Sequence, residues 1–196
     1  MMNKDQIIAV ISVVVIITFV GIVMYNTYGG RAETATGINT TPNYGVRTKT
    51  SGCQVRGPLQ DPACTPGAIF KSATKAKICV PGYAGSARNV PQSVKEQAYR
   101  EYGITRRDPG QYEVDHLISL QLGGSNDIAN LWPEAASPYP GFHEKDRIEN
   151  ALHDDVCKGR ISLAEAQREI ATDWLAVFYR YYPDAPKAPD AATPVS

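Results

Sequence analysis

The first strong hydrophobic pattern in the chain is an uninterrupted apolar run, IIAVISVVVIITFVGIVMY, at residues 7–25. As a helix this run would span about 28 Å, close to the hydrocarbon thickness of a bilayer. A cleaved signal peptide is the alternative, but no small-x-small cleavage site follows Tyr25. The pattern predicts an uncleaved membrane anchor over residues 1–25, with Lys4 favouring a cytoplasmic N-terminus and the rest of the chain outside the cytoplasm.

Three later segments have the spacing of amphipathic helices, at residues 91–102, 142–157 and 162–181. In the first two, apolar side chains recur along one stripe: Val94, Ala98 and Tyr102, then Ile148, Leu152 and Val156. Ser162 and Glu165 form a capping box, which marks the beginning of the third helix.

Two segments between these helices predict short strands. In residues 112–120 the side chains of Tyr112, Val114 and His116 would share one face. Leu131 and Trp132 predict a second strand that ends before Pro133. Few strands among several helices predict a small α+β domain, and Trp132 and Trp174 are expected in its core.

The remaining composition divides the chain into parts. Residues 26–51 are rich in Gly, Thr and Asn and predict a flexible tether. Residues 52–83 carry three cysteines and frequent Pro and Gly, which predicts an irregular, disulfide-tied lobe of the domain at 52–182. The Ala- and Pro-rich residues 183–196 predict a disordered tail.

The chain has four cysteines, Cys53, Cys64, Cys79 and Cys157, with no C-x-x-C pair. Outside the cytoplasm such a set predicts two disulfides, whereas free buried thiols would be expected in a reducing compartment. Of the three pairings, Cys53–Cys64 with Cys79–Cys157 is favoured: the first closes a short Pro/Gly loop, and the second joins the entry of the domain to the end of the helix at 142–157. A Cys64–Cys79 link remains the rival.

The formal net charge is +0 but is unevenly distributed: residues 31–113 carry a net +6 and residues 114–196 a net −6. A balanced total excludes a protein that coats nucleic acid by bulk charge. A basic face beside an acidic site could hold a phosphate backbone near a cation, and two solvated faces of one domain are the simpler interpretation.

The segment with the most chemical information ends the first strand at Asp115 and His116 and returns through GGSNDIAN to Asn130. A carboxylate and an imidazole are ligands for a divalent cation, and the imidazole can also take a proton from water. Neighbouring residues of a regular strand point to opposite faces, so both side chains could serve one centre only if the strand end is distorted.

The sequence VDHLISLQLGGSNDIANL at residues 114–131 resembles the core of the HNH, or His-Me finger, endonucleases. The resemblance is good over residues 112–132 and continues to His153, about a fifth of the chain. The flanking DPACTPGA, ICVPGY and HEKDRIENALH are similar to a bacterial secreted or anchored branch of that family. It implies a ββα-metal core, although here residues 133–141 separate the second strand from the helix that follows closely in the family.

The resemblance also implies roles for individual residues. His116 would be the general base, Asn130 would bond across the loop and hold His116 in place, and Asp115 would bind the metal. His143 would be the second metal ligand, with Glu144 and Asn150 as rivals on the same helix, and His153 is expected to be structural.

Lys145 and Arg147 would contact phosphate near the start of that helix, although ordinary surface pairing with neighbouring acidic residues is the simpler interpretation.

The expected function is therefore a metal-dependent endonuclease that hydrolyses phosphodiester bonds in DNA, with RNA as a further substrate and little base specificity. Its cofactor would be a divalent cation, Mg²⁺ before Mn²⁺ or Zn²⁺, with no small-molecule cofactor. Its partners would be nucleic acid and, through the N-terminal helix, the membrane. The alternative is a non-catalytic extracytoplasmic binding module that keeps the same fold.

Overall fold

The computed structural model describes residues 43–187, and the anchor expected at 1–25 lies outside them. None of the described helices combines the length and the apolar character needed to cross a membrane. In order along the chain the elements are α2 (Lys75–Ile78), α3 (Tyr83–Ala87), α4 (Gln92–Glu101), β1 (Tyr112–His116), η1 (Leu120–Leu122), η2 (Ile128–Asn130), β2 (Leu131–Ala135), α5 (Phe142–Lys158) and α6 (Leu163–Tyr181).

The sheet is a two-stranded antiparallel ribbon in which β1 pairs with β2 from Tyr112 opposite Ala135 to His116 opposite Leu131. The expected extension of β1 to Leu120 is wrong, because Ser119 caps the short helix η1 and turns the chain out of the strand. The expected end of β2 at Trp132 is also wrong. Pro133 pairs with Val114 inside the strand, and a two-stranded ribbon has free edges on which a missing N–H is tolerated.

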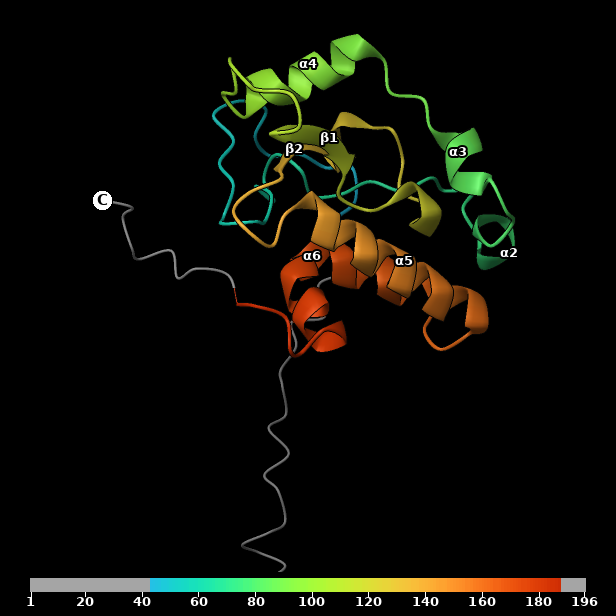
Figure 1. Cartoon of the computed structure of the whole chain (residues 1–196). Coiled ribbons are helices and arrows are strands. Elements are labelled where there is room, and N and C mark those ends of the chain that lie inside the picture. The colour runs from blue at the N-terminus through green and yellow to red at the C-terminus, as the bar shows by residue number, and fades with distance from the viewer. Residues whose placement is uncertain (1–42, 188–196) are drawn as a thin grey trace, which may run out of the picture. The chain divides into compact units, whose positions relative to one another are not determined.

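Helices enclose the ribbon from both sides. In Figure 1, α4 lies on one side of β1 and β2, and α5 with α6 lies on the other. The core joins β2 to α5 and α6 through fully buried side chains, with Trp132 and Trp174 both in it as expected. An α+β architecture is thus confirmed in its coarse form.

The three long helices lie where the hydrophobic pattern predicts them. Pro91 is the N-cap of α4 and has no N–H to leave unpaired. Ser162 caps α6, and its hydroxyl accepts a hydrogen bond from the backbone N–H of Glu165 at 3.1 Å. Gly159 ends α5 in the left-handed conformation (φ 76°), which costs least for glycine.

One disulfide closes a loop within the irregular lobe and a second joins the lobe to α5, and both expected pairings are confirmed. Cys53 bonds to Cys64, and Cys79 bonds to Cys157 near the end of α5. Cross-links of this kind contribute about 2–4 kcal/mol by limiting the unfolded chain. The lobe is otherwise built from turns and the short helices α2 and α3.

Part of the expected tether belongs to this domain. The backbone N–H of Gly45 donates to the carbonyl of Gly67 at 2.8 Å, and Thr48 donates to Ala63 at 3.0 Å. Arg47 pairs with the buried carboxylate of Glu101 on α4. The ordered domain therefore begins before the expected boundary at residue 52.

Candidate active site

The candidate site lies at the end of β1, where Asp115 and His116 follow one another in regular strand geometry. Asp115 is paired with Trp132 and His116 with Leu131 in an unbroken register, so the expected distortion is not found. The two side chains consequently have different surroundings. Asp115 bonds to α5, and His116 bonds to the loop before β2.

The imidazole of His116 is only 2% exposed and is held by Asn126. Its Nε2 lies 3.0 Å from Oδ1 of Asn126. Two hydrogen bonds to the end of α3 orient the amide of Asn126. Its Nδ2 donates to the carbonyl of Ala87 at 2.8 Å, and the backbone N–H of Asn89 donates to its Oδ1 at 3.3 Å. Because Oδ1 can only accept, Nε2 of His116 must carry the proton.

This bond leaves Nδ1 of His116 as the unprotonated nitrogen, and no side chain or backbone group of residues 43–187 donates to it. Burial lowers the pKa of His116 below its ordinary value, although the bond with Asn126 and the charge of Asp115 oppose the shift. The imidazole is therefore neutral at neutral pH, which is the form that can accept a proton from water.

Asn130 is completely buried and bonds across the loop, as expected, but its side chain does not hold the imidazole. Its Oδ1 accepts from the backbone N–H of Ile118 at 2.9 Å and of Ala68 at 3.3 Å. Its Nδ2 donates to the carbonyls of Ile118 and Ser125, both at 2.9 Å. Asn130 thus fixes the backbone that follows His116, while Asn126 fixes the ring.

The loop can close around Asn130 only because residue 124 is glycine. A Cβ at Gly124 would lie 1.7 Å from the carbonyl oxygen of Ile118 and 2.9 Å from Nδ2 of Asn130. The Gly-Gly pair of the loop is therefore explained by a close backbone approach.

Lys145 is the largest departure from the expected site. Its side chain is 0% exposed, and its ammonium donates to Oδ2 of Asp115 at 2.6 Å and to the carbonyl of His116 at 2.9 Å. It also bonds to Glu149 one turn along α5 and lies 3.9 Å from Glu134. An ammonium so enclosed does not face solvent, so its position does not support the expected contact with phosphate.

Charges around this buried lysine set the ionisation of Asp115 and Glu134. Burial alone would raise the pKa of Asp115, but the charge of Lys145, its hydrogen bond to Asp115 and smaller contributions from His116 and Glu134 together hold the pKa below its ordinary value. Burial raises the pKa of Glu134 well above its ordinary value, and the nearby Asp115 raises it further. Glu134 is thus a protonated neighbour of an ionised Asp115.

A second group of acidic side chains lies near Asp115. Burial raises the pKa of Glu113 to about 7, and the charges of Asp115 and Asp146 add to the shift. Burial and the charge of Asp115 also raise the pKa of Asp146 on α5. The charge of His143 opposes both shifts, which places this imidazole among the same carboxylates.

The rival metal ligands of α5 are engaged elsewhere. The carboxylate of Glu144 accepts from the backbone N–H of Gly141 at 2.8 Å and so caps its own helix. Asn150 accepts from Nε2 of Gln121 at 3.1 Å. His143 is exposed and packs its ring at 4.3 Å from that of Phe142.

The other expected residues of α5 have structural contacts. Arg147 stacks over the ring of Tyr182 at 4.0 Å. His153, as expected for a structural residue, bonds through Nε2 to the carbonyl of Ile78 at 3.1 Å.

The donor atoms fit a hard cation better than zinc. Among the described residues, three ligand side chains come within 4.8 Å of one another only at Cys79, His153 and Cys157 and at Cys53, Asp61 and Cys64. Both groups contain a disulfide, so their sulfurs are not thiolates. Neither Asp115 nor His143 belongs to such a group, and no contact joins the two side chains in the described structure. Mg²⁺ is commonly held by one or two carboxylates and several waters, whereas a zinc site needs three or four protein ligands.

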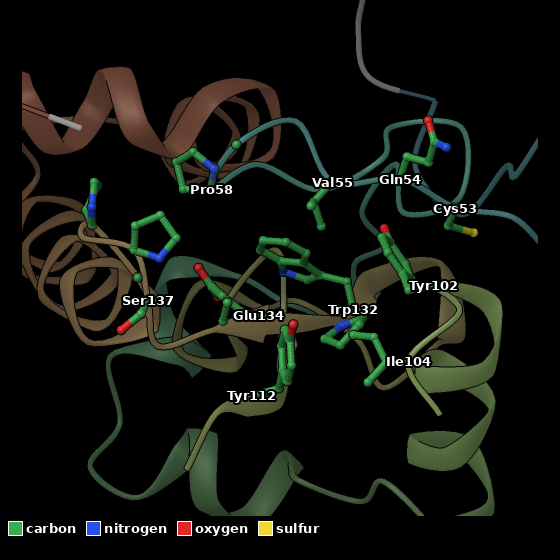
Figure 2. Close-up of a pocket in the computed structure, with 16 residues that line it drawn as sticks. Cys53, Gln54, Val55, Pro58, Tyr102, Ile104, Tyr112, Trp132, Glu134 and Ser137 are labelled. Carbon is green, nitrogen blue, oxygen red and sulfur yellow. The ribbon is translucent and has the colours of Figure 1, made fainter. Parts of the chain in front are cut away.

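A separate cavity of about 540 Å³ opens at the other end of the ribbon. Figure 2 shows Trp132 at its centre with Glu134 beside it on β2, Tyr112 below, and Val55 and Pro58 opposite. Its lining includes three aromatic residues and four prolines, and neither His116 nor His143 is part of it. The cavity thus does not contain the candidate base, although Glu134 lines it and also lies 3.9 Å from Lys145.

Asn126→Ala provides a test of the imidazole's support. The variant loses the three hydrogen bonds of the Asn126 side chain, to His116, Ala87 and Asn89. We expect the domain to stay folded while the phosphodiester cleavage that the resemblance implies falls about tenfold, because a ring free to rotate presents Nδ1 less often. The measurement is the rate of plasmid cleavage together with the thermal unfolding midpoint. Equal rates in Asn126→Ala and the wild type would show that the bond to Asn126 does not position the imidazole.

Comparison with protein-family models, with curated proteins and with solved structures yields no match to this chain.

Proposed function

We propose that this protein is a metal-dependent endonuclease that hydrolyses phosphodiester bonds in DNA or RNA with little base specificity. The observation that supports it most is the buried His116, which Asn126 holds through Nε2 so that Nδ1 is the nitrogen able to accept a proton. Asp115, the residue before it, is close enough for its charge to act on the imidazole, and Glu113 and Asp146 lie near Asp115. An imidazole base next to an acidic cation site is the minimum equipment for activating water against a phosphodiester. The order β1, β2, α5 agrees with the resemblance noted in the sequence.

In this proposal each group of the chain has one task. His116 takes the proton of the attacking water at Nδ1, and Asn126 keeps the ring in the required tautomer. Asp115 and His143 would hold a divalent cation, with Glu113 and Asp146 as further carboxylates nearby. The cation would supply charge neutralisation at the phosphate and the leaving oxygen. Lys145 keeps Asp115 ionised and attaches α5 to the end of β1.

The test is cleavage of plasmid DNA and of RNA by the full-length protein with Mg²⁺, Mn²⁺, Zn²⁺ or EDTA. We expect cleavage with Mg²⁺ or Mn²⁺ and none with EDTA. His143→Ala should raise the Mg²⁺ concentration needed for half-maximal cleavage, and His153→Ala, outside the site, should leave it unchanged. A folded protein that cleaves neither polymer with any metal would replace the enzyme by the alternative, a non-catalytic binding module.

We also propose that the domain faces the periplasm or the exterior on a single membrane anchor, or is secreted if that segment is cleaved. The apolar run at 7–25 and the two disulfides support this location. A reporter active only outside the cytoplasm, fused after Ser196, should be active. A reporter active only inside, fused at the same point, should be silent, and the reverse pattern would contradict the location.

A further inference from the structure

The end of α3 lies directly against the group that holds the candidate base. Asn126 bonds to His116 and also to the carbonyl of Ala87 and the backbone N–H of Asn89. Arg88 lies between Ala87 and Asn89, so its backbone is held on both sides. The side chain of Asn126 is all that separates this backbone from the imidazole of His116. Arg88 lies outside residues 112–132, where the resemblance to a nuclease is good, so the sequence alone does not single it out.

The side chain of Arg88 is exposed, and within residues 43–187 it has no hydrogen bond and no ion pair. Other arginines of the domain are engaged, such as Arg47 with Glu101, Arg107 with Glu96 and Arg180 with Glu169. A guanidinium left without a partner at a fixed backbone position is available for an anion from outside.

The charge of Arg88 acts on two members of the site from different elements. It acts on His116 at the end of β1 and on Asp146 on α5. Together with the contacts of Ala87 and Asn89 to Asn126, this places Arg88 close to the imidazole. A phosphate between His116 and a cation held by Asp115 would be within reach of it.

We propose that Arg88 binds the phosphate group at which the bond is cleaved. This inference rests on the proposed function and names a substrate contact of that same site. Guanidinium groups bind phosphate oxygens through two parallel N–H donors, which also fixes the orientation of the phosphate. Arg88 would thus align the diester with Nδ1 of His116 and add positive charge where negative charge accumulates in the transition state.

The experiment compares Arg88→Ala and Arg88→Lys with Arg100→Ala in the full-length protein. Arg100 is a matched control, since it is an exposed arginine without an ion pair in the described domain, and α4 lies across the ribbon from α5 (Figure 1). We expect kcat/KM for plasmid cleavage to fall 10- to 100-fold in Arg88→Ala and less in Arg88→Lys. Arg100→Ala should match the wild type, and all three unfolding midpoints should agree.

Two further measurements separate this contact from the activity itself. Bis(p-nitrophenyl) phosphate offers a single diester without flanking phosphates, and its hydrolysis should show the same Arg88→Ala loss. A loss on plasmid alone would overturn the placement at the cleaved phosphate.

Binding of a labelled oligonucleotide in EDTA should weaken in Arg88→Ala relative to Arg100→Ala, and equal binding would overturn the contact whether or not the wild type cleaves. Cleavage by the wild type with equal rates in Arg88→Ala and Arg100→Ala would overturn this inference and leave the proposed function standing.

Discussion

Replacement of His116 by alanine should abolish phosphodiester cleavage while the domain stays folded. A positioned general base contributes on the order of 10²–10⁴-fold to rate. Among the described residues, the side chain of His116 has one hydrogen bond, to Asn126. Replacing the side chain therefore leaves the backbone pairing of β1 with β2 in place. The expected result is a fall of that size in kcat, with thermal unfolding close to that of the wild type.

Metal titration and a histidine control make this prediction specific. His116→Ala should bind Mn²⁺ as the wild type does, because His116 is assigned to proton transfer and not to metal binding. The control is His153→Ala, which removes the bond from His153 on α5 to the carbonyl of Ile78 and should retain cleavage. Wild-type rates in His116→Ala would refute the role of the imidazole, and a loss of metal binding together with activity would make His116 a ligand.

Patterns within short stretches of sequence correctly predicted the buried face of α5 and the beginning of α6, because both depend on residues close together in the chain. The stripe of Ile148, Leu152 and Val156 is completely buried along α5, because a periodic apolar face has one way to be shielded from water. Ser162 caps α6 through a bond that involves residues three positions apart. The Cys79–Cys157 bond joins segments 78 residues apart, and it was favoured because it would link the entry of the domain to the end of the helix at 142–157.

The parts that the sequence could not predict depend on contacts between distant segments. Asn126 looks like any polar loop residue, and its role becomes visible only when α3 supplies Ala87 and Asn89 on its other side. Asn130 was expected to hold His116, but three of its bonds go to the backbone of Ile118 and Ser125 and the fourth to the backbone of Ala68. Two asparagines four positions apart therefore share a task that the sequence assigned to one.

The buried position of Lys145 also depends on contacts between distant segments that the sequence does not predict, and it has a larger effect on the stability of the fold. In the sequence it lies among Glu144, Asp146 and Glu149, a pattern typical of a solvated helix face. In the fold its stem passes into the space between α5 and β1, where Asp115 and the carbonyl of His116 accept from the ammonium. Only the tertiary structure places three carboxyl groups around this one cation.

Lys145→Met should destabilise the domain by about 3–5 kcal/mol, the cost of removing one partner from a buried ionic group. Methionine keeps most of the apolar stem, so the effect reports on the lost charge more than on a cavity. Without the ammonium, burial would raise the pKa of Asp115, because the charge and the hydrogen bond of Lys145 are what lower it. The pKa of Glu149, which burial raises to about 7, would rise further for the same reason. Each carboxyl group would then be buried either as an unpaired charge or as a protonated acid. The measurement is the free energy of unfolding from chemical denaturation with both disulfides intact.

Lys158→Met is the matched control, because Lys158 also pairs with an acidic residue one turn away on α5. That pair, with Asp154, is exposed, the lysine side chain being 58% accessible, so it should contribute less than about 1 kcal/mol. The difference between the two variants isolates burial as the cause. Similar small losses in both would show that Lys145 is not an essential ionic link. A large loss in Lys145→Met that Asp115→Asn partly reverses would identify the uncompensated carboxylate of Asp115 as its source.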